Sequence, residues 1–217
     1  MNKILTLIKK DISIELKNSN VISGILLYVV SGILITYVVF DANISVKNWC
    51  VLYWLIFMFS SITAVSKSFV QEDKSRNIYY YLTAKPQHII LAKIIYNVVL
   101  LLLVVAIHTL LYMLMLGNPI NNILLFVASV ILGTSCISSI LTLISAIASK
   151  ASNNFTLLSI LSFPLVLPVL VVLQKLTEWS LLGTQSNVPL NYLLAILLLT
   201  IAIISLAYIL FPKICNE

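Results

Sequence analysis

Six long apolar runs occupy most of this 217-residue chain. An apolar helix of about 20 residues crosses the roughly 30 Å hydrocarbon core of a bilayer, and a helix satisfies its own backbone hydrogen bonds there. Only 9% of the residues are charged, against about 25% in a soluble domain. The sequence therefore predicts an all-α polytopic membrane protein with one transmembrane domain over residues 1–217. The predicted spans are 21–40, 49–69, 89–116, 120–149, 155–173 and 189–211.

The basic residues are distributed unevenly across these spans. Six crossings place both termini on one side, and eleven of the 13 lysines and arginines lie on that side. The two others, Lys47 and Lys175, lie in the opposite loops. Because basic residues accumulate in cytoplasmic loops, we predict that both termini are cytoplasmic. We also expect Trp49, Trp54 and Trp179, near the outer span ends, to lie at the membrane interface.

Residues 2–20 precede the first span. Their apolar residues recur near helical spacing, and lysines occupy the other faces. A basic amphipathic helix of this kind lies in the membrane interface. An alternative is that this segment is only a positively charged flank that orients the first span.

Sequence motifs for catalysis and for metal binding are absent. The chain contains no GxxxxGK[ST], HExxH or CxxCH motif, and no acidic residue lies deep in a span. The cysteines Cys50, Cys136 and Cys215 are scattered and form no CxxC pair. An intramembrane hydrolase needs a nucleophile with its base, or paired carboxylates. We therefore predict no enzymatic activity, no metal site and no cofactor bound by this chain.

One histidine lies deep within a span, in its outer half. His108 belongs to the third span, and Tyr112 follows one turn later. Ionisable residues inside membranes commonly serve function, so this histidine could bind a solute, ligate the metal of a porphyrin or relay protons. The alternative is a neutral histidine that is hydrogen-bonded to a neighbouring helix, for example to a hydroxyl of the fourth span. Exposing an imidazole to lipid costs several kcal/mol, roughly, so we expect it to line an internal polar cavity with Tyr112.

Two further patterns concern helix shape and packing. Pro164 and Pro168 lie in the fifth span, within FPLVLPVLV, and each removes a backbone donor. They predict a break in that helix, either as a mobile element or as a static bend. In the fourth span, Thr134, Ser138 and Thr142 share one face at i, i+4 spacing. Such small residues indicate close helix packing, with a solute-lining stripe as the alternative.

The densest polar stretch is residues 71–88, QEDKSRNIYYYLTAKPQH, between the second and third spans. Tyrosine and arginine are enriched at protein interfaces, so we predict a short cytoplasmic helix that docks on a partner. Alternatively, the tyrosines only anchor the loop at the membrane surface. The candidate docking residues are Glu72, Asp73, Arg76, Ile78, Tyr79, Tyr80, Leu82 and Pro86, which closes the segment.

This segment resembles that of the ABC-2-type exporter permeases. Their pattern is similar to E-[ED]-x-x-[RG]-x-[TI]-x-x-x-L-x-x-x-P, followed by alanine and lysine at the next span. The matching residues here are Glu72, Asp73, Arg76, Ile78, Leu82, Pro86, Ala92 and Lys93. Within that group, the chain length, the sparse external loops and the FPLVLPVLV stretch resemble the CcmB family, the haem exporter permeases of cytochrome c maturation.

The resemblance implies a permease subunit in a bacterial inner membrane. It would work with a separate ATP-binding subunit of the CcmA type and with the haem-handling proteins CcmC and CcmD, and residues 71–88 would be the coupling helix. Haem would be a ligand that the complex transports or handles, because the tryptophan-rich haem-binding motif of CcmC is absent here. The substrate-path candidates are His108, Tyr112, Pro164 and Pro168. No nucleic acid partner is expected.

Two other functions fit the same residues. One is an ABC-2-type exporter permease for another substrate, such as a lipid, a drug or a polysaccharide. The other is a membrane scaffold that recruits partners without transporting anything.

Overall fold

The structure, a computed structural model, describes residues 5, 7–8, 19–40, 44–69, 85–149, 154–183 and 190–216. These residues contain six long helices and no strand. All six helices are long and apolar enough to cross a membrane, which confirms the predicted all-α, six-span fold. They are α2 (Ser19–Phe40), α3 (Val46–Phe69), α5 (Pro86–Leu116), α6 (Ile123–Ala148), α7 (Asn154–Leu182) and α8 (Leu190–Asn216).

The two predicted extramembrane helices fall largely outside the described residues. Of the interfacial helix expected at residues 2–20, the structure describes only residues 5, 7–8 and 19–20. Of the expected coupling segment at 71–88, it describes residues 85–88. Pro86 to His88 of that segment belong to α5.

Local chemistry explains where α5 and α6 begin. Pro86 is the first residue of α5, after an extended Lys85, rather than a residue of the preceding loop. Proline suits this position because the first helical N–H has no partner in the helix anyway. At the start of α6, the Asn122 side chain accepts a hydrogen bond from the Leu125 N–H at 3.1 Å. This cap sets the start of α6 at Ile123 rather than at residue 120.

The end of α7 differs from the prediction. The fifth span was expected to end at residue 173, with Lys175 and Glu178 in a loop, but α7 continues to Leu182. Gly183 then adopts a left-handed conformation, with φ of 63°, and donates its N–H to the Trp179 carbonyl oxygen. Glycine takes this conformation without a steric penalty, so the helix ends here and not at the first polar residues.

The two prolines do not interrupt α7, so the predicted break of the helix is not observed, whereas a bend at the prolines stays a prediction. α7 is continuous through Pro164 and Pro168. Each proline removes one donor and strains one turn, but the remaining peptide groups keep their bonds and the helix persists. Both prolines lie on the exposed face of α7, where no neighbouring helix restricts the local geometry.

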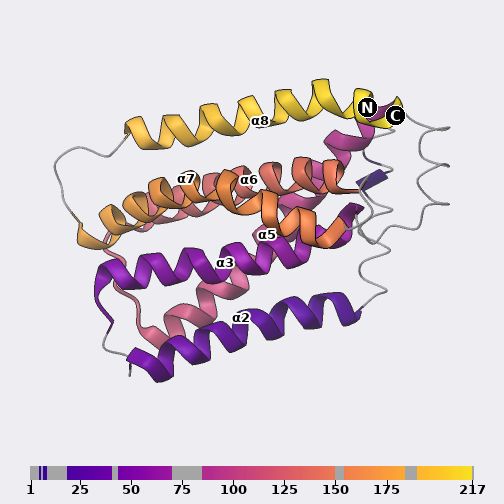
Figure 1. Cartoon of the computed structure of the whole chain (residues 1–217). Helices are drawn as coiled ribbons and strands as arrows, with labels where there is room; N and C mark the ends of the chain where they lie inside the picture. The colour runs from indigo at the N-terminus through magenta and orange to yellow at the C-terminus, as the bar shows by residue number, and fades with distance from the viewer. Residues whose placement is uncertain are drawn as a thin grey trace.

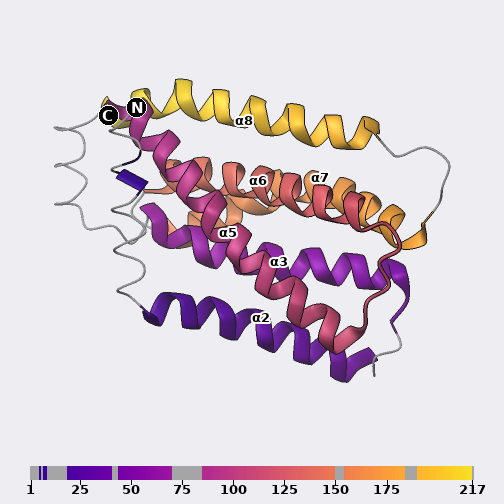
Figure 2. The ribbon, with the colours of Figure 1, turned by 180° about the vertical axis from the view of Figure 1, so that it is seen from behind.

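The helices form a bundle with α6 at its centre. α6 packs against α3, α5, α7 and α8, and in both views it runs beside α7 (Figures 1 and 2). α5 crosses the bundle obliquely, from α8 near Pro86 to α2 near Leu116 (Figure 2). α2 and α8 form the two edges, with only 22% and 11% of their spans buried inside the bundle.

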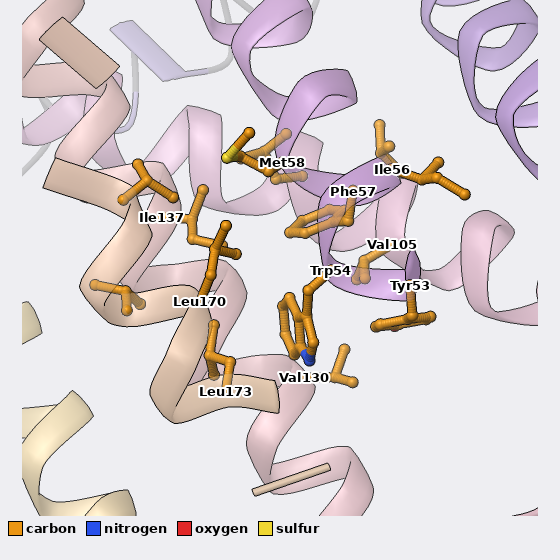
Figure 3. Close-up of a cluster of buried hydrophobic side chains, with 14 of the residues drawn as sticks. Tyr53, Trp54, Ile56, Phe57, Met58, Val105, Val130, Ile137, Leu170 and Leu173 are labelled. Atoms are coloured by element: carbon orange, nitrogen blue, oxygen red, sulfur yellow. The ribbon is translucent and has the colours of Figure 1, made fainter. Parts of the chain in front are cut away.

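Three helices meet closely at Gly133 of α6. A Cβ atom there would lie 2.6 Å from Leu173 Cδ2 of α7 and 2.8 Å from Trp54 Cη2 of α3. Figure 3 shows the Trp54 ring beside Leu173 and Val130. The indole Nε1 of Trp54 donates to Thr177 Oγ1 at 3.3 Å. α3, α6 and α7 are therefore joined by one tight contact and one buried hydrogen bond.

The tryptophans only partly occupy the predicted places. Trp49 and Trp54 are each 1% exposed, so the prediction that they anchor the membrane interface is wrong. Both point into the bundle, where large rings fill the space between helices. Trp179 is 37% exposed, as an interfacial anchor would be.

We expect Gly133→Ala to lower the free energy of unfolding by about 1–3 kcal/mol, because the added methyl overpacks a rigid indole. The matched control is Gly24→Ala in α2, where a Cβ would meet nothing within 4 Å. Thermal unfolding in detergent checks this. Equal midpoints for the two variants would show that α3, α6 and α7 do not approach this closely.

Candidate functional site

The first candidate site is a cluster of rings between α3 and α5, which we call the aromatic cluster. α3 supplies Trp49, Tyr53 and Phe57 at i, i+4, i+8 spacing, and α5 supplies His108 and Tyr112. The Tyr53 ring stacks on His108 with centroids 4.7 Å apart, and on Trp49 at 5.5 Å. Tyr112 meets Trp49 edge-on at 4.8 Å and His108 edge-on at 5.4 Å.

Both tyrosine hydroxyls of the aromatic cluster are hydrogen-bonded. The Tyr53 hydroxyl lies 2.7 Å from Thr109 Oγ1, which itself donates to the Val105 carbonyl oxygen. The Tyr112 hydroxyl donates to the Trp49 carbonyl oxygen at 3.1 Å. These two bonds fix the outer half of α5 against α3.

The imidazole of His108 has no such partner. The residue is fully buried and does not face lipid. Neither ring nitrogen finds a hydrogen-bond partner among the described residues, and Trp49 Nε1 has none either. The alternative of a bond to a fourth-span hydroxyl is therefore not observed. The rings that pack on His108 include those of Tyr53 and Phe57. Because the His108 side chain is 0% exposed, no water-sized space adjoins it.

A second buried site lies between the inner half of α5 and α6. Asn97 Nδ2 donates to Thr142 Oγ1 at 2.9 Å, and Thr142 donates to the Ser138 carbonyl oxygen at 2.6 Å. Four polar atoms nearby in sequence have no partner among the described residues: Asn97 Oδ1 and the hydroxyls of Thr134, Ser138 and Ser145. We call Asn97, Thr134, Ser138, Thr142 and Ser145 together the polar seam.

The polar seam is dry and energetically unfavourable. All five residues are 0% exposed. A buried polar group without a partner costs about 1–3 kcal/mol, and such groups in native structures require an explanation. The spacing of Thr134, Ser138 and Thr142 predicted the hydroxyl face of α6, but Asn97 was not predicted to belong to the site. The feature of the sequence that could have indicated Asn97 is a side-chain amide inside an apolar run, four residues after Lys93.

The structure separates the four substrate-path candidates. His108 and Tyr112 lie together in the aromatic cluster, whereas Pro164 and Pro168 lie on the outward face of α7. A shallow apolar groove of about 500 Å³ lies between the outer halves of α5 and α6. It includes Thr109 but none of the four candidates.

The predicted docking residues lie elsewhere in the chain. Pro86 starts α5, and the other docking candidates are outside the described residues. Among the residues that the structure does describe, no group of three histidine, cysteine or acidic side chains could hold a metal ion.

Comparison with known protein families decides the identity. The family model described as the CcmB protein matches residues 2–210. The chain belongs to the CcmB family. No curated protein matches it. The resemblance found in the segment before α5 and in the proline-containing span is thus confirmed over nearly the whole chain.

CcmB membership gives the buried sites a context. The family is a transporter permease subunit, the permease component of a haem exporter. Membership implies an ABC-type complex that includes an ATPase subunit.

We expect His108→Phe to leave stability unchanged or to raise it by about 1 kcal/mol, because the ring still stacks and two unpaired nitrogens are removed. Tyr112→Phe is the matched comparison. It removes the bond to the Trp49 carbonyl and should cost about 1 kcal/mol. Thermal unfolding in detergent measures both. A clear loss of stability in His108→Phe would show that the imidazole has a partner in solution.

Proposed function

We propose that this CcmB chain is the membrane permease subunit of an ATP-driven complex in a bacterial inner membrane, which exports or handles haem during cytochrome c maturation. The observation that carries the proposal is the family match over residues 2–210, together with six helices able to cross a membrane. Residues 1–217 form one transmembrane permease domain in this proposal.

The partners follow from the same proposal. A separate protein of the CcmA type binds and hydrolyses ATP, since this chain has no phosphate-binding loop of its own. CcmC and CcmD handle haem. Haem is the cargo of the complex, and this chain contributes helix movement.

The arrangement of α3 and α5 supports mechanical coupling. Residues 70–84 connect the end of α3 to the start of α5, so a force on this segment acts on both helices. α5 is one uninterrupted helix of 31 residues from Pro86 to Leu116. Rigid movement of a packed helix is a known way to transmit a conformational change. A partner that grips residues 71–88 would therefore move the polar seam.

Orientation can be tested by thiol labelling of a variant without native cysteines. We expect cysteines at Ser45 and Ser186 to react with an impermeant reagent added from outside, and a cysteine at Ser75 to react only after the membrane is opened. The reason is the excess of basic residues on the side of residue 75. Labelling of Ser75→Cys in intact cells would reverse the topology.

Docking can be tested by replacing Tyr79, Tyr80 and Leu82 together with serine. We expect the ATPase to be lost on purification while the membrane protein remains folded, because buried aromatic anchors contribute about 2 kcal/mol or more each. Asn77→Ser, in the same segment, is the matched control and should retain the ATPase.

Replacing the charged residues of the segment should affect the coupling of the ATPase to the membrane subunit more than its binding. Glu72, Asp73 and Arg76 lie at the start of the predicted helix, where rim charges chiefly orient a complex.

An ATPase that co-purifies undiminished with the triple serine variant would contradict the docking proposal.

A further inference from the structure

The hydroxyls of α6 fall into two kinds. Ser129, Ser135 and Ser139 each donate to the carbonyl oxygen one turn back in their own helix, which is the usual solution for a hydroxyl in lipid. Thr134, Ser138 and Ser145 make no hydrogen bond with the described residues. Ser138 and Ser139 are neighbours, both are buried, and only one is satisfied. The orphaned hydroxyls therefore mark one face of α6, not a general property of the helix.

That face is turned toward α5. Thr142, which lies on it, accepts the hydrogen bond from Asn97. Residues at i, i+4 spacing share a helix face, so Thr134 and Ser138 follow Thr142 along the same side. With Asn97 Oδ1 and Ser145, four unsatisfied polar atoms thus line the contact between two helices. No water molecule fits against them, because all of these side chains are 0% exposed.

The helices on the two sides of the polar seam are held differently. The start of α6 is tied to the end of α7, because the N–H groups of Asn121 and Asn122 both donate to the Ser180 carbonyl oxygen, at 3.2 and 2.8 Å. The Asn121 side chain also donates to the Leu181 carbonyl oxygen. α3 joins these helices at Gly133 and Thr177. Helices α3, α6 and α7 are therefore joined to one another as one frame.

α5 is buried against its neighbours along both its halves. Its bonds to α3 come from Thr109 and Tyr112, in the aromatic cluster. Toward the inner end, the bond from Asn97 to Thr142 is joined by aliphatic packing of Ile90 and Ile94 against Leu143. The inner end of α5 is also the end that follows residues 71–84. A force applied there reaches the inner half of α5 first, where this helix contacts α6 at Asn97 and Thr142.

We propose that the polar seam is the closed form of a polar passage between α5 and α6, which opens toward the cytoplasm and admits water and a solute with hydrogen-bonding groups. This proposal rests on the proposed function, since it needs an ATPase to move α5. In the open form, Asn97 and the orphaned hydroxyls of α6 gain water or solute as partners. In the closed form they are left unsatisfied, which favours reopening.

The test measures water access in the intact complex, purified with its partner proteins and placed in vesicles. A background in which Cys50, Cys136 and Cys215 are replaced by alanine, and which still hydrolyses ATP, carries single cysteines. We expect Thr134→Cys, Ser138→Cys and Ser145→Cys to react with a water-soluble methanethiosulfonate reagent several-fold faster in one nucleotide state than in the others. Ser139→Cys is the matched control and should stay unreactive throughout.

A second measurement does not depend on reagent access. Asn97→Cys together with Thr142→Cys should form a disulfide on oxidation, stop ATP-driven transport and recover it on reduction. Transport that continues across the crosslinked seam would overturn the proposal. So would a complex that hydrolyses ATP while all three seam cysteines stay unreactive in every nucleotide state, although the proposed function would stand. A purified complex without ATP hydrolysis would overturn the proposed function and the passage with it.

Discussion

In the hydrocarbon core of a membrane, each polar group must find its hydrogen-bond partner inside the protein. Most of this bundle obeys that constraint locally: Ser60, Ser61 and Ser162 donate to carbonyls of their own helices. Trp54 bonds across helices to Thr177. Several exceptions involve one side of α5, where Asn97 and His108 are buried with unpaired atoms. Other exceptions lie on α6, and α5 is the helix that leads out of the segment predicted to bind the ATPase.

The contacts among α3, α6 and α7 differ in kind from the contacts that α5 makes with them. α3, α6 and α7 are joined where Gly133 leaves room for the Trp54 indole, and bonds from residues 121 and 122 to Ser180 keep α6 and α7 in register. Close helix packing of this kind has few intermediate positions. α5 meets the frame through stacked rings at one end and through aliphatic side chains and one amide bond at the other. Both ends of α5 are buried, and the inner contact with α6 is the one that includes Asn97 and its unpaired amide oxygen.

Hydropathy predicted the six helices well, because span length and apolar composition are fixed by the bilayer. It failed where side-chain direction matters. Trp49 and Trp54 were expected at the interface, but hydropathy cannot tell which face of a helix meets lipid. α7 was ended too early because Lys175 and Glu178 look like loop residues, whereas the helix stop is Gly183. Pro164 and Pro168 predicted a break, but α7 continues through both of them. Asn97 became visible only when packing placed it opposite Thr142.

The edge helix α8 has a consequence of its own. Within residues 190–213 of α8, whose burial the structure describes, the buried apolar residues are Ile196, Ala207 and Phe211. The last two belong to a cluster with the inner ends of α5 and α6. Elements with few buried contacts open at a lower free energy than the rest of a protein. α8 should therefore behave as a separate cooperative unit, with amides that exchange with deuterium before those of α6. Lateral pressure from lipid would contribute much of its attachment, so the choice of detergent during purification would decide whether this helix stays in place.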